Sequence, residues 1–201
     1  EGGILGSVVP ALTGRVLGAL QMFCSARFLT VGPGLKSGIK LRLDNPAQLG
    51  AELLCGAVAA LEEGPGPLAV ISADTAISIM AVNGKQELVG GVILPGPQLS
   101  LSALVQKTAQ LPQIDLSAPA SSSILGKNTS ACLQNGFVLG TAGLLDGLAE
   151  RFQAELGPDI RFYATGNLPR TIREACRTPI EYREYLITDG LYRIWQKNRK
   201  G

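Results

Sequence analysis

The 201-residue chain contains no histidine. This absence excludes serine and cysteine nucleophiles activated by histidine, histidine metal sites and histidine pH switches. Any proton transfer must therefore use carboxylates, lysine, tyrosine, cysteine or backbone groups. An excess of one charge sign is also lacking, because 18 basic residues face 16 acidic ones for a net charge of +2. That excess is too small to indicate a nucleic acid or a membrane surface as a partner.

Cysteine is scarce, and its four residues lie far apart, at Cys24, Cys55, Cys132 and Cys176. No two of them form a C-x-x-C pair, so we expect neither a zinc or iron–sulfur site nor the disulfide framework of a small secreted protein. Reduced thiols in the core are the simplest interpretation. Long hydrophobic runs are missing too, since none approaches the ~20 residues of a membrane span. With no signal peptide visible at residues 1–3, we expect a cytoplasmic protein.

The composition is 46% hydrophobic against 17% charged, which suffices for a packed core and excludes disorder. The Gly-Pro-Gly-Pro segment at residues 64–67 predicts a linker between a first part, residues 1–66, and a second part, residues 67–201. Residues 3–9 predict a buried strand, so the chain begins inside a core element. This indicates either the remainder of a longer protein or a processed form.

Apolar periodicity predicts an α/β order of elements. In the first part we expect helices over 11–24 and 45–61, strands over 28–31 and 39–43, and a glycine-rich loop over 32–38. Asn45, Pro46 and Gln48 are expected to form the capping box of the second of these helices.

The second part is expected to open with an antiparallel meander that turns at Ala73-Asp74 and at Asn83-Gly84. Its strands are predicted over 68–72, 75–82 and 86–94, and are followed by helices near 99–110 and 128–156, a strand over 160–165 and two short helical segments. Glycines recur every three or four residues within 128–156. Such spacing indicates close packing inside the fold or, alternatively, a subunit interface.

Several short motifs follow one another in an order that is more specific than any one of them. They occupy residues 7–10, 32–38, 44–46, 50–51, 90–96, 99–104, 126–129, 164–166 and 189–191. Together they resemble the type III pantothenate kinases, members of the actin-like kinase superfamily, over nearly the whole chain. The resemblance implies an α/β, actin-like (ribonuclease H-like) fold of two lobes. The first lobe is expected to be incomplete, because the family's first phosphate loop, Asp-x-Gly-Asn-Thr, would precede Glu1.

The resemblance also implies a reaction, namely ATP-dependent phosphorylation of pantothenate at the start of coenzyme A synthesis. A carboxylate would take the proton of the substrate hydroxyl, which attacks the γ-phosphate. The implied cofactors are ATP, Mg²⁺ and a monovalent cation, K⁺ or NH₄⁺, and the implied partners are pantothenate, ATP and a second copy of the chain. The alternative is a catalytically silent relative that serves as a structural or regulatory dimeric subunit.

Site residues follow from the same resemblance. The implied substrate-binding positions are Leu43, Gly50, Ala51, Glu52, Leu53 and Thr129. Glu52 stands where the family has an aspartate as general base, one methylene further out, and Leu53 replaces an arginine. Leu43 replaces a tyrosine that contacts the substrate. Without the resemblance, Glu52 would be a solvated helix residue and Thr129 a helix cap.

The family's second phosphate motif, Asp-x-Gly-Thr-Ala-Thr-Thr, corresponds to residues 72–78. Ser72 takes the place of the aspartate that holds the monovalent cation, and a hydroxyl is a poorer ligand for a hard cation. Asp74 replaces a glycine and brings negative charge to a phosphate position. Thr75 and Gly166 match positions that contact the nucleotide. Asp74 is otherwise an ordinary turn residue and Thr75 an ordinary strand residue.

Overall fold

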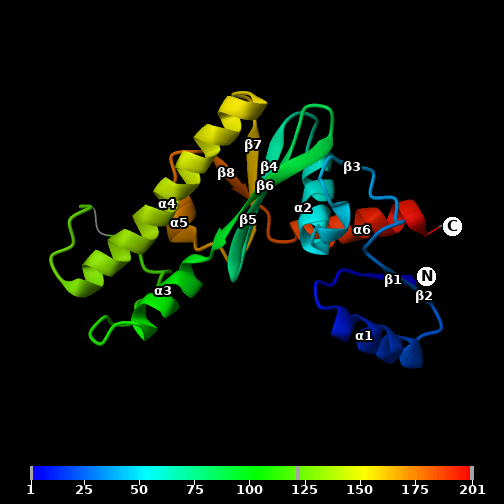
Figure 1. The fold of residues 1–201 in the computed structure, drawn as a ribbon, viewed down its shortest axis with the longest axis horizontal. Coiled ribbons are helices and arrows are strands. Elements are labelled where there is room, and N and C mark those ends of the chain that lie inside the picture. Colours follow the sequence, from blue (N-terminus) through cyan, green and yellow to red (C-terminus); the bar gives the residue numbers. More distant parts are fainter. Residues whose placement is uncertain (1, 121–122, 200–201) are drawn as a thin grey trace.

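The computed structural model describes residues 2–120 and 123–199, which form two sheets with their helices. The parallel strands β1 (Gly2–Leu5) and β2 (Arg27–Thr30) make a small sheet, connected by helix α1 (Pro10–Phe23) (Figure 1). The other elements are β3 (Lys40–Leu41), the 3₁₀ helix η1 (Pro46–Gln48), α2 (Ala51–Glu62), β4 (Leu68–Ala73), β5 (Ala76–Val82), β6 (Glu87–Pro95), α3 (Pro97–Gln106), α4 (Thr129–Leu156), β7 (Arg161–Gly166), α5 (Arg170–Ala175), β8 (Ile180–Tyr182) and α6 (Leu186–Asn198). The predicted α/β class is confirmed.

The large sheet has the strand order β3-β6-β5-β4-β7-β8. Strand β5 is antiparallel to both neighbours, whereas β7 is parallel to β4 and to β8. A meander followed by two parallel strands is the ribonuclease H-like arrangement that the resemblance implies. The predicted hairpin is present, because the Asn83 side-chain oxygen accepts the N–H groups of Lys85 and Glu87, and Gln86 adopts a φ of 58°. The four-residue turn delays the start of β6 to Glu87.

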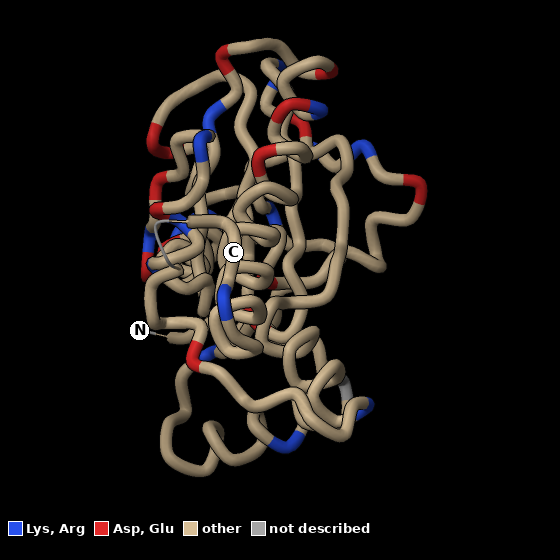
Figure 2. Tube along the Cα trace, turned by 90° about the vertical axis from the view of Figure 1, so that its left-hand side faces the viewer, with Lys and Arg blue, Asp and Glu red and all other residues tan. Residues whose placement is uncertain are grey.

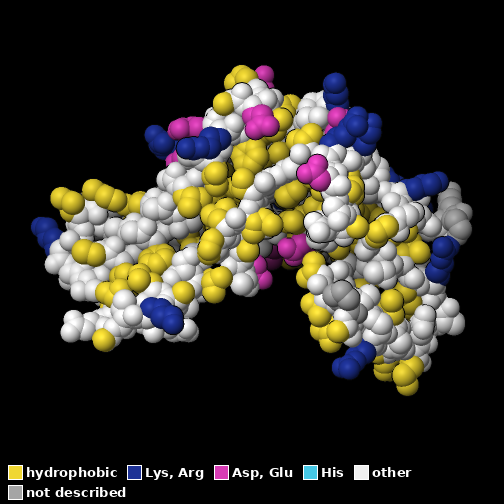
Figure 3. Space-filling model, in the orientation of Figure 1, with side chains coloured by type: hydrophobic (Ala, Val, Ile, Leu, Met, Phe, Trp, Pro, Cys, Tyr) yellow, Lys and Arg dark blue, Asp and Glu magenta, His cyan; other side chains and the backbone are white. Residues whose placement is uncertain are grey.

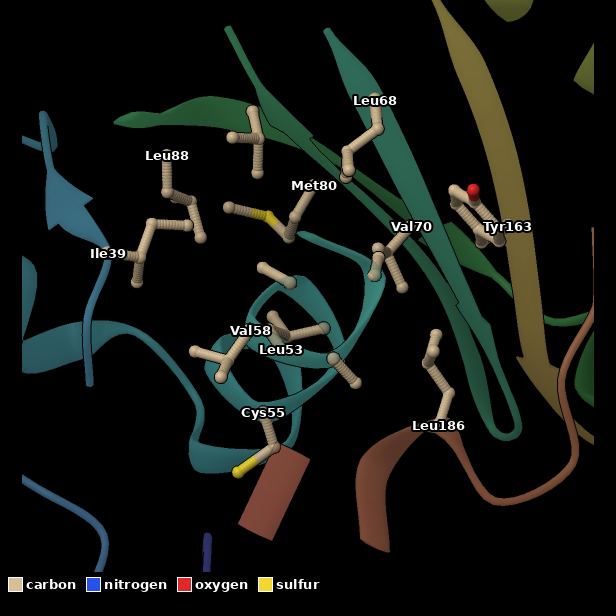
Figure 4. Packing of buried hydrophobic residues seen from close by; sticks show 14 of the residues in the cluster. Ile39, Leu53, Cys55, Val58, Leu68, Val70, Met80, Leu88, Tyr163 and Leu186 are labelled. Carbon is tan, nitrogen blue, oxygen red and sulfur yellow. The ribbon is translucent and has the colours of Figure 1, made fainter. Parts of the chain in front are cut away.

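Each face of the large sheet packs against its own helices (Figure 1). Side chains alternate along β4, so that Leu68 and Val70 face α2 and α6, and Ala69 and Ile71 face α4 and α5. Figure 4 shows the first of these clusters, in which α2 and Leu186 of α6 lie on the same face of the sheet. Full burial of one such aliphatic side chain stabilises the fold by about 1.5–3 kcal/mol. The sheet therefore carries a core on both faces.

A buried carboxylate fixes the segment that leads into β8. Asp146 of α4 accepts hydrogen bonds from the backbone N–H groups of Arg177 at 3.0 Å and Thr178 at 2.9 Å. Burial raises the pKa of Asp146, but these hydrogen bonds lower it more strongly, so its pKa lies below the usual range. The three-residue strand β8 was not predicted, because its position depends on this contact with α4 rather than on its own sequence pattern.

Three predictions about the first part are wrong. Strand β1 ends at Leu5 and is only partly buried, since β2 is its single neighbour. The helix predicted over 45–61 is divided at Gly50, whose extended ψ of 138° separates η1 from α2. Asn45 therefore caps η1 through the Ala47 N–H, and Gln48 completes no capping box for α2. The helix predicted over 11–24 is present as α1, and its apolar side chains are largely exposed, with Phe23 at 91%.

The four cysteines are free. Cys55 is fully buried, and burial raises the pKa of its thiol to about 12. Cys176 is half-buried, whereas Cys24 and Cys132 are exposed and are not the core thiols that we expected. In the described ranges no helix combines the length and hydropathy that a membrane span requires.

The segment predicted as a linker is held against β7. The Arg161 guanidinium donates to the carbonyl oxygens of Gly64 at 2.6 Å and Pro65 at 3.0 Å. Helix α2, which precedes this segment, shares the core of the large sheet. The division of the chain into two lobes at residue 66 stays a prediction. Helix α2, which belongs to the first of these lobes, packs against the strands of the second.

Helices α2 and α6 approach each other most closely at Gly190. A Cβ atom placed on Gly190 would collide with the carbonyl group of Cys55. We expect Gly190→Ala to lower the free energy of unfolding by about 1–3 kcal/mol, because overpacking forces two buried helices apart. Urea unfolding measures this change.

Gly18→Ala is the matched control, because nothing lies within 4 Å of a Cβ on this α1 residue. It should leave stability unchanged or raise it by up to about 1 kcal/mol, since alanine is the better helix former. A Gly190→Ala protein that unfolds like the Gly18→Ala control would contradict the close contact.

Candidate functional site

A hollow with a volume of about 810 Å³ lies at the N-terminus of α2. We call it the α2 hollow. It is lined by Ser7, Val8, Val31, Gly32, Pro33, Gly34, Leu35, Ser37, Ile39, Leu41, Asn45, Pro46, Ala47, Gln48, Leu49, Gly50, Ala51 and Leu54. Ligands of α/β proteins bind beyond the carboxyl ends of parallel strands. The loops that follow β1 and β2 both contribute to this hollow, which makes it the first candidate site.

The C-terminal turn of α6 holds one wall of the α2 hollow. The Asn198 side chain accepts the N–H of Lys36 and donates to the Lys36 carbonyl oxygen, both at 3.0 Å. Next to it, the Lys197 ammonium group donates to the Ser37 carbonyl oxygen at 3.3 Å. Residues more than 160 positions apart in sequence thus fix the glycine-rich loop over 32–38.

Two of the predicted substrate positions, Gly50 and Ala51, line the α2 hollow. Glu52 is exposed in the first turn of α2 and lines a smaller hollow of about 100 Å³, which shares Ser7, Val8 and Ala51 with the first. A carboxylate therefore lies beside the α2 hollow, within the same end of the helix.

Leu53 and Leu43 lie elsewhere. Leu53 is buried in the core between α2 and the sheet, as Figure 4 shows, and Leu43 packs against the same cluster. Neither lines the α2 hollow. Helical geometry separates Leu53 from the hollow, because Leu53 is on the face of α2 that packs against the sheet, whereas the preceding Glu52 is on an exposed face.

The predicted nucleotide positions gather at the carboxyl ends of β4 and β7. In the β4–β7 register Ser72 lies beside Thr165 and Ala73 lies beside Gly166. Gly166 has a φ of 81° and ends β7. Thr75 is exposed in the turn that follows β4. The sequence thus brings Ser72, Thr75 and Gly166 to one edge of the sheet.

A hydrogen bond that we did not predict joins the two turns at this edge. The Asn167 amide donates to the Asp74 carboxylate at 3.0 Å, and both side chains are exposed. Asx residues at the ends of neighbouring parallel strands are the sequence signal that could have indicated this contact. Figure 3 shows the molecule hollowed between the parts that carry α3 and α1, with acidic side chains at the top of this hollow.

The nucleotide positions and the N-terminus of α2 share one end of the fold. A Cβ on Gly56 of α2 would lie 3.1 Å from Val70 Cγ1 of β4, so the two elements are in contact near their middles. The short connection over 63–67 makes α2 antiparallel to β4. The start of α2 and the end of β4 therefore point the same way.

Thr129 lies apart from these residues. It begins α4, which Asn128 caps through the Ala131 N–H, as we predicted for either residue. Thr129 lines a third hollow of about 330 Å³ together with Leu104, Leu111, Cys132, Leu133, Gly136 and Phe137. Figure 1 shows the first turn of α4 at the far left and α2 on the right. One chain does not bring Thr129 to the α2 hollow.

Comparison with known proteins decides the family. The profile described as "Type III pantothenate kinase" matches residues 1–151. The chain belongs to the type III pantothenate kinase family. A type III pantothenate kinase of Koribacter versatilis (strain Ellin345) is 36% identical over 199 residues, which are 99% of this chain and 72% of the relative. That of Dehalococcoides mccartyi is 38% identical over 196 residues, 98% of this chain and 74% of the relative.

A solved structure shows the same fold. A conserved Baf family protein from Campylobacter jejuni superposes with a TM-score of 0.63 at 18% identity, covering 100% of this chain and 85% of its own. The resemblance to the type III pantothenate kinase family and the mixed α/β fold are thus confirmed.

Proposed function

We propose that the α2 hollow is the substrate site of a pantothenate kinase and that ATP binds at the carboxyl ends of β4 and β7. The observation that carries this proposal is the position of Gly50, Ala51 and Glu52 at the first turn of α2, beside the hollow. In this arrangement Glu52 takes the proton of a substrate hydroxyl while the hydroxyl oxygen attacks the γ-phosphorus of ATP; the bond from this phosphorus to the β,γ-bridging oxygen breaks, and ADP leaves. The partial positive charge at the N-terminus of α2 favours negative charge that develops beside it.

Ser72, at the monovalent-cation position, is a poor ligand for the cation that the resemblance implies there. No group of three or more cysteine, aspartate and glutamate side chains in metal-ligating arrangement occurs in the described part of the chain. The Ser72 side chain offers a half-buried hydroxyl group. We derive no step through Mg²⁺ or K⁺.

The second candidate function is a catalytically silent subunit. The observation that favours it is the Asp74 carboxylate, which lies at the edge proposed for phosphate and is held there by Asn167. A like charge at this place opposes nucleotide binding. Leu53 adds to the argument, because a core leucine cannot bind a polar substrate.

We expect this chain to phosphorylate pantothenate slowly or not at all, below the ~1 s⁻¹ at the low end for kinases. A coupled ADP-release assay with pantothenate measures the rate. Any turnover should fall at least ~100-fold in Glu52→Gln, because the proton acceptor is lost. Glu62→Gln at the other end of α2 is the control and should change nothing. Turnover near ~1 s⁻¹ that depends on Glu52 would contradict the slow rate.

ATP binding should be weak, indifferent to potassium and stronger in Asp74→Gly. Removal of the carboxylate is expected to tighten binding about tenfold, since one like charge at close range costs ~1 kcal/mol or more. Calorimetric titration of ATP into the unmodified chain and into Asp74→Gly, with and without potassium, tests these three statements. Asp159→Gly, at the opposite end of β7, is the control. A clear potassium requirement would show that another group holds the cation.

We also propose a homodimer in which α4 lies at or beside the interface. Residues 128–145 contain no charged side chain, and Gly136, Gly140 and Gly143 have open space beside them. Figure 2 shows basic and acidic residues interspersed along the chain rather than gathered in large patches of one sign. A dimer would also let Thr129 of a second copy reach the α2 hollow, which one chain does not allow.

Light scattering at high micromolar concentration should report a dimer, and Gly140→Lys should convert it to a monomer by placing an ammonium group in the interface. Gln153→Lys, near the other end of α4, should leave the dimer intact. A monomeric unmodified chain would overturn the homodimer.

A further inference from the structure

The peptide group that joins Gly166 to Asn167 is held from both neighbouring strands. On the β4 side, the Asn167 N–H donates to the Ala73 carbonyl oxygen. On the β8 side, the Gly166 carbonyl oxygen accepts a hydrogen bond from the Tyr182 hydroxyl group at 2.9 Å. Because a peptide group is planar, hydrogen bonds on its two sides fix its orientation. They thereby fix the turn at the edge proposed for ATP.

Strand β8, which carries Tyr182, is itself anchored independently of this turn. It runs parallel to β7, and Tyr182 lies beside Ala164 in the register (Figure 1). The Arg183 N–H donates to the Ala164 carbonyl oxygen at 2.8 Å. The segment that leads into β8 is held by the buried Asp146 carboxylate of α4. The Tyr182 hydroxyl group therefore acts on the turn from a fixed support.

The Tyr182 ring has a charged partner on its face. The Arg173 guanidinium of α5 lies 4.0 Å from the ring centroid. The Arg173 Nε is buried and has no hydrogen-bond partner among the described residues, which leaves the aromatic face as the group that attracts it. Helix α5 follows directly after the turn, so Arg173 completes a closed set of contacts between the turn and Tyr182.

The hydrogen bond from Tyr182 is not needed to satisfy a buried group. Gly166 is only half-buried, and a carbonyl oxygen that water can reach loses little when a protein donor is removed. The contribution of the hydroxyl group is instead to restrict the orientation of the peptide group. Restricting a binding loop in one conformation raises affinity, because less ordering remains to be done when the ligand binds.

We propose that Tyr182 is a positioning residue for ATP. Its hydroxyl group orients the peptide between Gly166 and Asn167, and Arg173 holds its ring in place. Tyr182 acts through this turn and does not itself touch the nucleotide. This inference rests on the proposed ATP site at the carboxyl ends of β4 and β7.

Tyr182→Phe is the direct test, because it removes the hydroxyl group and keeps the ring. Calorimetric titration of the full chain should show ATP binding weakened about three- to tenfold, the range that one neutral hydrogen bond covers. Tyr163→Phe is the matched control, since the Tyr163 hydroxyl group accepts a hydrogen bond from Arg161 at 2.9 Å, away from the turn. ATP affinity should be unchanged in this control, and urea unfolding compares the stability of the two variants.

A merely structural role for Tyr182 would weaken ATP binding equally in the two phenylalanine variants. That outcome, or an unchanged ATP affinity in Tyr182→Phe, would overturn the inference and leave the proposed ATP site standing. If the unmodified chain binds no ATP, the proposed ATP site itself fails, and the inference fails with it.

Arg173→Met tests the support of the ring. In the unmodified chain it should weaken ATP binding about threefold, whereas in Tyr182→Phe it should change nothing further, since no hydroxyl group remains to be positioned. Arg170→Met removes the same charge from the same helix and is the control, with no change expected. An equal loss from Arg173→Met in both backgrounds would show that Arg173 acts on ATP directly, and would contradict its action through Tyr182.

Discussion

The burial of α2 is the constraint on which the rest of the structure depends. Small residues such as Ala57 and Ala60 are fully enclosed, and Gly190 lets α6 come into contact with the Cys55 carbonyl. This close packing fixes the direction of α2 against β4, so its first turn opens toward the proposed site. It also fixes α6, whose Asn198 then holds the loop over 32–38. Core packing thus shapes the wall of the α2 hollow.

Family membership and site chemistry diverge along this chain. The strand order and the two cores follow from the apolar positions of this chain. At the site, by contrast, Leu53 belongs to the core, and Asp74 accepts a hydrogen bond from Asn167. Such changes leave the fold intact because they lie in a turn or fill the core, whereas phosphoryl transfer depends on charge and position. The fold can therefore persist while activity weakens.

The sequence predicted the meander best, because its short apolar strands and the Asn83-Gly84 turn are local signals. It failed where one strand or helix depends on a distant partner. The break at Gly50 comes where α2 begins to pack against the sheet, and β8 follows a segment that is held by Asp146 on α4. The family motifs gave Gly50, Ala51 and Glu52 as substrate positions, and these residues do line neighbouring hollows, although their role there stays a prediction. Periodicity could not show which side of α2 each residue takes.

The sequence by itself determined the fold class, the family and the absence of histidine chemistry, because composition, motif order and local periodicity are properties of the chain alone. Only the tertiary structure decided which predicted residues meet. It separated Thr129 from Gly50, buried Leu53 and joined Asp74 to Asn167. The physical reason is that packing across the sheet, rather than distance along the chain, decides which side chains become neighbours.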